Sequence, residues 1–228
     1  MISIFLPIKK DSKRLKNKNF FSIKKYKLGL TEIKLNQLLK LSKILKKKKI
    51  QSEIVISTDS ENLIKKYNNF KNIKVYKRPK NLTLDDCLDD LIMEVPKLCS
   101  GNYILWTHVT SPLFNSLDYI DFMDKFFRQK KFKSAFSATS ASTFFMNSNF
   151  KWISHNEKKK KWPRTQDLQK YYLVNNAAFI SSRKNYIFDK NRIGPKPMPI
   201  ISRKYSEIDI DNKEDLLFLV KNYINIKL

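Results

Sequence analysis

Short runs of apolar residues, continuous rather than alternating, recur along the chain and constrain its fold more than any other feature. Such runs are typical of strands that are buried on both faces of a sheet. Amphipathic helical patterns lie between the early runs. This alternation of strand and helix through residue ~130 predicts βαβ units on a mainly parallel sheet, which is an α/β fold. The seven predicted strands span residues 2–7, 53–59, 73–78, 103–109, 134–140, 172–181 and 198–201.

Four helices are predicted between and after these strands. In the second of them, Thr83 is expected to cap the helix, and Asp85 and Asp86 are expected in its first turn. Asn115 and Asp118 resemble a capping pair at the start of the third. The chain has no internal repeat and no Gly/Ser linker, so we expect one domain over residues 1–228. The predicted helices span residues 31–46, 83–95, 115–129 and 212–223.

The formal net charge of +25 calls for an explanation. Lysines displace the counterions condensed on nucleic acid, so a polyanionic partner is one reading. The chain is also rich in Asn, Ile and Phe, a bias that AT-rich coding produces without selection for binding. The lysine runs 46–49 and 158–161 are more typical of solvated surface, and neither lies in a recognisable nucleic-acid-binding motif. Nucleic acid is therefore not the favoured partner.

Several features indicate the compartment. No apolar run approaches the ~18 residues of a membrane span, so we expect no membrane partner. The start of the chain lacks the charged, apolar and small-residue regions of a signal peptide. Cys87 and Cys99 have no CxxC spacing, which favours reduced thiols over a disulfide or a zinc site. A cytoplasmic location is the expectation.

The segment 140–170 breaks the alternation of strands and helices. It places aromatic residues among charges with no clean period, and we expect these side chains to be exposed. One reading is a long surface loop; the other is an excursion whose aromatics bury against a second subunit. The aromatic residues are Phe144, Phe145, Phe150, Trp152 and Trp162.

Polar clusters follow most of the early strands, at the point where each strand ends. Open parallel sheets bind ligands at the carboxyl ends of their strands, so this placement predicts one site for an anionic ligand. Because the charges converge, a small phosphorylated ligand is favoured over a long polymer. Three glycines in the whole chain exclude both a Walker A loop and a GxGxxG fingerprint. The clusters are 9–19, 57–59, Arg78, 107–111 and 207–216.

Asp209 and Asp211 stand two residues apart on an extended segment, so both side chains point to one face. Such a pair suits Mg²⁺, which typically takes one or two carboxylates plus substrate phosphates. The alternative is structural, because Asp211 and Glu214 also have the spacing of a capping box for the last helix. His108 is predicted to line the pocket at a strand end rather than to act as a catalytic base.

Motifs along nearly the whole chain resemble the acylneuraminate cytidylyltransferase family, which makes CMP-activated sialic and related sugar acids. The opening stretch "PIKKDSKRLKNKN" resembles the family's "PARGGSKGIPxKN", with Pro7, Ser12, Lys13, Lys18 and Asn19 in place. The further matches are "VISTDSENL" (55–63) to "VSTDxxxI", "YKRP" (76–79) to "xxRP", "THVTSPLF" (107–114) to "LQPTSPLR", "RTQDLQKYYLVNNAAFI" (164–180) to "RxQDLPxxYxxNGAxYI" and "IDIDNKEDL" (208–216) to "IDIDTPEDL".

The chain departs from the family's pattern in its phosphate loop. The signature arginine is Lys9, and its two glycines are Lys10 and Asp11. A glycine loop approaches phosphate with its backbone N–H groups, so side-chain cations are expected to take over that contact here. The family's glutamine is His108, and its "NGA" is "NNA" at 175–177.

The resemblance implies a Rossmann-like nucleotidyltransferase fold, with a mainly parallel sheet flanked by helices and 140–170 as a dimerisation excursion of a homodimer. It implies that CTP and a sugar acid give CMP–sugar acid and pyrophosphate. The alternatives are a nucleotidyltransferase for a different sugar acid or nucleotide, and a catalytically degenerate relative that binds nucleotide or nucleic acid.

The resemblance also implies residue roles. Lys9 and Lys18 are the implied catalytic cations, and Asp209 and Asp211 the implied catalytic carboxylates that carry Mg²⁺. The nucleotide-binding residues are Lys9, Ser12, Lys18, Asn19, Arg78, His108 and Thr110, and the sugar-binding residues are Arg164, Gln166, Tyr172 and Asn175.

Overall fold

The computed structural model describes residues 1–12, 14–84 and 86–222. Lys13 and Asp85, together with the last residue of the predicted helix 212–223, lie outside the described residues. All seven predicted strands are confirmed, with ends that differ by one or two residues. The strands are β1 (Ile2–Ile8), β2 (Ser52–Thr58), β3 (Ile73–Lys77), β4 (Tyr103–Thr107), β5 (Ser134–Ala141), β6 (Tyr171–Ser182) and β7 (Pro197–Ile201).

The strands form a seven-stranded sheet in the order β3-β2-β1-β4-β6-β5-β7. β1 pairs in parallel with both β2 and β4, and β2 with β3. β6 runs antiparallel to β4 and β5, whereas β7 pairs in parallel with β5. The expectation of a mainly parallel sheet is therefore confirmed. The chain turns back across the sheet between β3 and β4, which makes the β1/β4 boundary a topological switch point.

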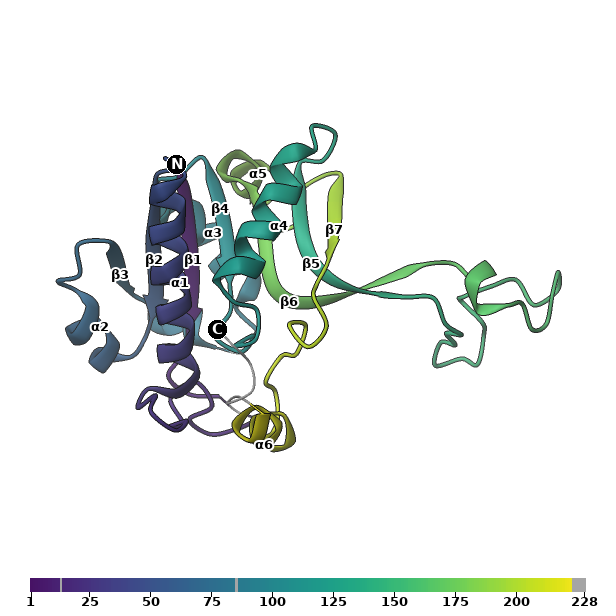
Figure 1. The fold of residues 1–228 in the computed structure, drawn as a ribbon, viewed down its shortest axis with the longest axis horizontal. Helices are drawn as coiled ribbons and strands as arrows, with labels where there is room; N and C mark the ends of the chain where they lie inside the picture. The colour runs from purple at the N-terminus through teal and green to yellow at the C-terminus, as the bar shows by residue number, and fades with distance from the viewer. Residues whose placement is uncertain (13, 85, 223–228) are drawn as a thin grey trace.

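Helices cover both faces of the sheet (Figure 1). On β1, Ile4 and Leu6 belong to the larger apolar core under α1 and α4, whereas Phe5 belongs to the smaller core under α3 and α5. This division follows from the alternation of side chains along a strand. The helices are α1 (Gly29–Lys47), α2 (Glu61–Tyr67), α3 (Leu88–Leu98), α4 (Ser116–Arg128), α5 (Arg183–Phe188) and α6 (Lys213–Asn222), with the 3₁₀ turns η1 (Lys80–Thr83) and η2 (Thr165–Asp167).

The helix prediction needs three corrections. First, α3 begins at Leu88, not at residue 83. Thr83 does not cap it, because Thr83 ends η1 and its hydroxyl donates to the Lys80 carbonyl. Second, α2 and α5 were not predicted, since each is only two turns long or shorter and shows little periodicity. Third, the cap of α6 is displaced by one residue, as described with the site. The capping box of Asn115 and Asp118 on α4 is confirmed.

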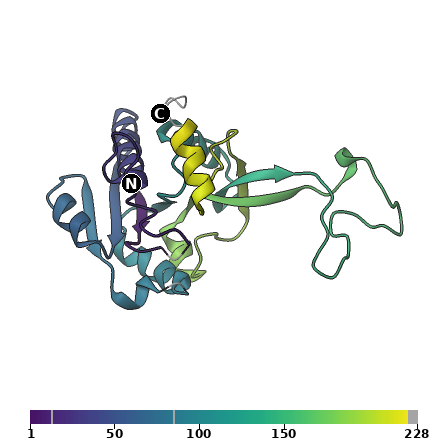
Figure 2. The same cartoon turned by 90° about the horizontal axis from the view of Figure 1, so that it is seen from below.

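Residues 142–170, here called the arm, extend far from the sheet between β5 and β6 (Figures 1 and 2). Phe144, Trp152 and Trp162 form a cluster of rings in the arm, with centroids 5.1–5.8 Å apart. The expectation that all its aromatics are exposed is therefore wrong in part. Phe144, Phe145 and Trp152 are half-buried within the arm, whereas Phe150 and Trp162 remain 84% and 68% exposed.

No helix among the described residues is long and apolar enough to cross a membrane.

Candidate active site

A cleft of about 480 Å³ lies at the carboxyl ends of the parallel strands. In Figure 1 these strand ends point to the lower side of the sheet. The walls of the cleft come from the loop after β1 and from the residues after β4, so it opens at the topological switch point. Residues from three of the five predicted polar clusters, 9–19, Arg78 and 107–111, line this cleft. The lining residues are Pro7, Lys9, Asp11, Ser12, Arg14, Lys18, Asn19, Arg78, His108, Val109 and Thr110.

The loop after β1 reaches its shape without glycine. Asn17 adopts a left-handed backbone with φ +57°, a conformation that asparagine tolerates better than most residues. The Asn19 side chain donates to the Lys9 carbonyl at 2.8 Å, and the Asn19 carbonyl accepts from Thr31 of α1. Asn19 thus ties the start of the loop to α1.

A backbone amide near the start of this loop is held by an acidic side chain. The Lys10 N–H donates to the Asp59 carboxylate at 2.7 Å, just beyond β2. In a glycine loop this part of the backbone is where phosphate contacts form. This N–H is therefore not free to donate to a phosphate, whereas the side chains of Lys9, Arg14 and Lys18 line the cleft. That lysine side chains take over the phosphate contacts stays a prediction.

Cations from two segments, the loop after β1 and the residues after β3, face the cleft. The Arg78 guanidinium is buried and held by Ser57, through its Nε to the hydroxyl (3.2 Å) and its Nη2 to the carbonyl (2.7 Å). Lys18 is also buried, and its ammonium lies 3.0 Å from Asp211. Arg14 lies 2.7 Å from the same carboxylate. Arg14 was not singled out from the sequence, although it belongs to the basic loop that was.

Asp209 and Asp211 flank the buried Ile210, whose N–H donates to the Thr110 carbonyl. That bond fixes the pair against the end of β4. Burial raises the pKa of Asp209, and the charge of nearby Asp211 adds to this, while Lys18 and hydrogen bonds from Thr110 and Asn176 oppose it. The Oδ1 atom of Asp209 is buried and has no hydrogen-bond partner among the described residues.

An unpartnered buried carboxylate oxygen is costly unless a cation meets it. The described residues contain no group of three or more Asp, Glu, His or Cys side chains that could hold a metal. Two carboxylates completed by substrate phosphates are nevertheless a usual set for Mg²⁺. Asp209 and Asp211 therefore fit this ion.

Asp211 is not the cap of α6, which corrects the structural alternative for this residue. The backbone N–H groups of Asp211 and Asn212 donate to the Asp215 carboxylate, and the Asp215 N–H donates to the Asn212 side chain. The capping box is therefore Asn212 with Asp215, not Asp211 with Glu214. Because two cations occupy the Asp211 carboxylate, it has no role in the cap.

Asn176 is a site residue that the sequence analysis did not assign. Its φ is +59°, a left-handed conformation at the position where the resembling motif has glycine. The pairing of β5 with β6 shifts register between Phe136 and Ala138, opposite this segment. This local irregularity brings Asn176 to Asp209. The change from "NGA" to "NNA" could have pointed to Asn176, because it places asparagine where the resembling motif has glycine.

The four residues implied to bind the sugar are not gathered in the cleft of one chain. Arg164 and Gln166 lie in the arm, where the Arg164 guanidinium pairs with Asp167 at 2.9 Å. Tyr172 is exposed on the part of β6 that leads into the arm. Asn175 lies nearer the body of the sheet and donates to the Ser202 hydroxyl at 2.8 Å.

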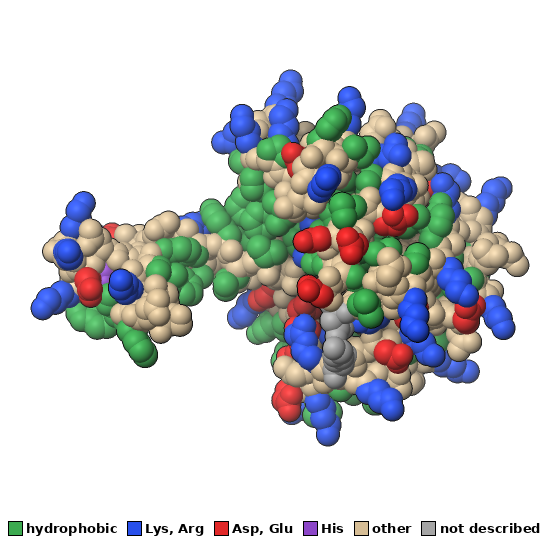
Figure 3. Space-filling view, turned by 180° about the vertical axis from the view of Figure 1, so that it is seen from behind, with side chains coloured by type: hydrophobic (Ala, Val, Ile, Leu, Met, Phe, Trp, Pro, Cys, Tyr) green, Lys and Arg blue, Asp and Glu red, His purple; other side chains and the backbone are tan. Residues whose placement is uncertain are grey.

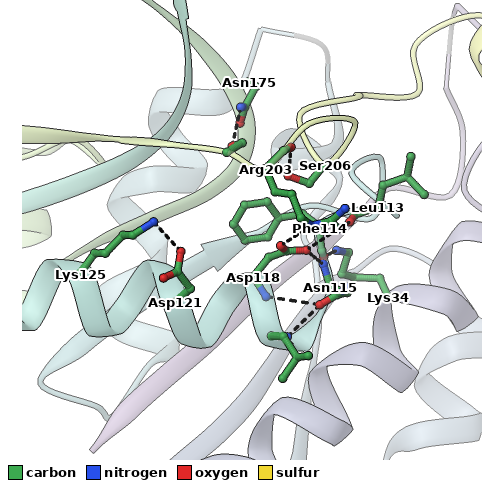
Figure 4. A network of polar contacts seen from close by, with 12 residues as sticks. Lys34, Leu113, Phe114, Asn115, Asp118, Asp121, Lys125, Asn175, Arg203 and Ser206 are labelled. Atoms are coloured by element: carbon green, nitrogen blue, oxygen red, sulfur yellow. Dashed lines mark hydrogen bonds and ion pairs between the residues drawn. The ribbon is translucent and has the colours of Figure 1, made fainter. Parts of the chain in front are cut away.

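A buried lysine supports the segment that follows β4 (Figure 4). The Lys34 ammonium, from α1, donates to the carbonyls of Ser111 and Phe114, both at 2.8 Å, and to the Tyr119 hydroxyl at 3.1 Å. Burial lowers the pKa of Lys34 to about 7, with Asp118 opposing the shift. Residue spacing carries no signal for this contact, because the partners lie at least 77 residues away.

Comparisons with known proteins support the fold. No family model matches the chain, and no curated protein matches it by sequence. Solved structures do match. A CMP:2-keto-3-deoxy-manno-octonic acid synthetase complexed with CTP is 12% identical, covers 98% of both chains and has a TM-score of 0.64. A 4-diphosphocytidyl-2C-methyl-D-erythritol synthase from Anaerococcus prevotii is 14% identical over 98% of both chains, with a TM-score of 0.65.

A 2-C-methyl-D-erythritol 4-phosphate cytidylyltransferase from Francisella tularensis is similar to the same degree, at 13% identity and a TM-score of 0.65 over 97% of this chain and 98% of that one. The identities are low, whereas the coverage is nearly complete in each case. The chain therefore has the Rossmann-like nucleotidyltransferase fold that these cytidylyltransferases share.

Proposed function

We propose that this protein is a cytidylyltransferase that transfers CMP from CTP to a sialic-acid-like sugar acid and releases pyrophosphate. The observation that carries the proposal is that cationic side chains line a cleft at the switch point and that two of them, Arg14 and Lys18, pair with Asp211. The structural neighbours support the choice of nucleotide, because all three are named for cytidylyl chemistry and one was solved with CTP. The motif resemblance supports the choice of a sugar acid.

In the proposed reaction, a hydroxyl of the sugar acid attacks the α-phosphorus of CTP. The new P–O bond forms as the bond to the β-phosphate oxygen breaks, pyrophosphate leaves with the electron pair, and the proton of the hydroxyl passes to water. Lys9, Lys18 and Arg78 neutralise the triphosphate and stabilise the leaving group. Ser12 and Asn19 shape the loop beside them, and His108 and Thr110 line the junction between nucleotide and sugar. Most of the catalysis is positioning.

Asp209 and Asp211 would hold Mg²⁺ beside this cleft. The bound ion would supply positive charge at the phosphate oxygens. In its absence, Lys18 and Arg14 balance the charge of Asp211, so the ion would have to compete with both cations. At the Oδ1 atom of Asp209, which has no hydrogen-bond partner among the described residues, the ion would displace no protein cation.

We also propose a two-fold homodimer in which the arm contacts a second copy. Hydrophobic side chains gather where the arm joins the body (Figure 3). On β6, three consecutive apolar residues, Tyr172, Leu173 and Val174, are each exposed by 43% or more. An exposed patch of this kind is unusual on a monomer. The dimer would also give Arg164 and Gln166 a route to a cleft, that of the partner.

A second candidate is a cytidylyltransferase for a different acceptor. The fold match to methylerythritol phosphate cytidylyltransferases is as good as that to the sugar acid synthetase, so a small phosphorylated alcohol is the specific rival. A degenerate nucleotide binder is the remaining alternative, because the phosphate loop has lost its glycines.

One assay separates these readings. Pyrophosphate release is measured with each of the four nucleoside triphosphates, Mg²⁺, and a panel of eight- and nine-carbon sugar acids plus 2-C-methyl-D-erythritol 4-phosphate. The proposal expects release with CTP and a sugar acid. Release with the erythritol phosphate alone would replace the sugar acid by the rival acceptor. CTP binding without release from any pair would leave a degenerate binder.

A further inference from the structure

Arg192 lies behind the cleft in an aromatic slot and does not line the cleft itself. It belongs to the loop between α5 and β7. Its guanidinium carbon sits 4.0 Å from the centre of the Phe179 ring and 5.4 Å from that of Trp106. Its Nη1 atom lies 3.3 Å from Nε2 of His108. Among the described residues no carboxylate pairs with it, so this charge is held by ring faces and by one imidazole.

The contact decides which nitrogen of His108 carries a proton. An arginine is always protonated and can only donate, so Nε2 of His108 must accept. In a neutral imidazole the other nitrogen, Nδ1, is then the donor. Because Nε2 is engaged by Arg192, Nδ1 is the nitrogen left for a ligand in the cleft that His108 lines.

The surroundings of His108 oppose a second proton. Burial, together with the charges of Arg192, of Lys34 on α1 and of Lys18 in the loop after β1, lowers its pKa to about 3. The charged groups that act on the ring from these three elements are thus all cations. Protonation would also turn Nε2 into a donor that faces another donor. Across the ordinary pH range His108 is neutral.

We infer that Arg192 is a positioning residue that fixes His108 as a neutral Nδ1–H donor in the cleft, so that the ligand group meeting His108 must be a hydrogen-bond acceptor. A carbonyl, phosphate or carboxylate oxygen satisfies this requirement, and an amino group does not. The glutamine found here in the resembling family can turn its amide to offer either a donor or an acceptor. His108 with Arg192 behind it offers a donor alone. Assigning the ligand to CTP rests on the proposed function.

The second histidine of the chain provides an internal reference. In the arm, Nε2 of His155 lies 3.1 Å from the Lys161 carbonyl, and a carbonyl can only accept. Nε2 of His155 therefore carries a proton. The two histidines of the chain are expected to have opposite tautomers when both are neutral, and each can be read in one spectrum.

The test is a long-range ¹H–¹⁵N correlation spectrum of the full chain labelled at histidine, recorded from pH 5.5 to 8. The expected wild-type result is an Nδ1–H tautomer for His108 that does not titrate over this range. In Arg192→Met, His108 should shift toward the Nε2–H form or begin to titrate. Lys184→Met is the matched control, because it removes an exposed cation of α5 that does not contact His108. A wild-type Nε2–H tautomer at His108 would overturn the inference without any variant.

A functional readout follows the same logic. Arg192→Met should weaken CTP binding about fivefold, the worth of one hydrogen bond of ~1 kcal/mol. In a His108→Gln background, the same change should cost less than about twofold, because glutamine can orient its own donor. Equal losses in both backgrounds would show that Arg192 does not act through His108. If the wild type binds no CTP, the proposed function fails while the tautomer spectrum still decides this inference.

Discussion

Replacing Lys34 with methionine tests how the segment after β4 is held beneath the cleft. Methionine has a similar length and fills the apolar channel around the lysine stem, but it removes all three donors. The carbonyls of Ser111 and Phe114 then lose a buried partner. Tyr119 loses one as well, although its hydroxyl still donates to the Ala177 carbonyl. An uncharged lysine amine has two N–H donors rather than three, so at roughly 1 kcal/mol for each lost hydrogen bond the cost is about 2 kcal/mol when the lysine is uncharged.

The stability that Lys34→Met loses should increase with pH, because the pKa of Lys34 is lowered in the folded protein. The pKa of Lys34 is about 7 in the folded protein, against 10.5 for an ordinary lysine. Between these values the unfolded chain binds more protons than the folded one, so the free energy of unfolding of the wild type rises with pH. Integrating from pH 7 to 9 gives a gain of about 2 kcal/mol over a variant without this group. Lys34→Met should thus lose about 2 kcal/mol at pH 9 but almost nothing at pH 7.

Urea unfolding of the wild type and of Lys34→Met at pH 7, 8 and 9 measures this difference, since other groups titrate alike in both. Lys43→Met serves as the control, because Lys43 is exposed on the same helix. A loss of equal size at all three pH values would refute the reasoning. It would mean that three acceptors keep the ammonium charged despite its burial.

The remaining predictions concern the cleft and the arm. Asp211→Asn should leave the melting temperature nearly unchanged and lower turnover by orders of magnitude across a Mg²⁺ titration; near-normal turnover would make the carboxylate pair structural. Asn212→Ala should do the opposite, costing about 1 kcal/mol of stability through the lost cap while turnover survives. Lys9→Ala should weaken the binding of CTP far more than the binding of CMP, whereas Lys9→Arg should keep the affinity for CTP; isothermal titration measures both. Equal CTP affinity for Lys9→Ala and wild type would remove this loop from the site. In light scattering at micromolar concentration the wild type should have the mass of a dimer and Leu173→Asp that of a monomer, and a monomeric wild type contradicts the assembly.

The strands were predictable from the sequence because burial on both faces leaves an unbroken apolar run, as in β1 and β4. Residues that follow directly on such strands were placed for the same reason, so Lys9 and His108 reached the cleft as expected. Helix starts were harder. Thr83 has the chemistry of a cap, but a 3₁₀ turn after Pro79 delays α3 to Leu88. Capping rules, which consider only the residues around a helix start, do not predict when a preceding 3₁₀ turn takes up the expected cap residue.

Contacts between distant segments could not be predicted from spacing. Asp211 and Glu214 have the separation of a capping box, yet Arg14, 197 residues away, occupies the carboxylate. Arg192 carries no local signal, because its partner His108 is 84 residues away. The predicted exposure of the aromatic residues in the arm was wrong in part for another reason. Phe144 and Trp152 look exposed when the segment is read as a loop, and only its fold-back brings their rings together.

The placement of the three tryptophans gives the protein built-in optical reporters. Trp106 is fully buried in the wall behind the cleft, whereas Trp152 and Trp162 belong to the arm. Emission from the arm pair responds to the polarity around the arm, and emission from Trp106 responds to opening of the sheet. A Trp106→Phe variant and a variant with both arm tryptophans replaced by phenylalanine separate the two signals. Dilution and denaturant titrations of this pair can then follow association and unfolding independently, without an added dye.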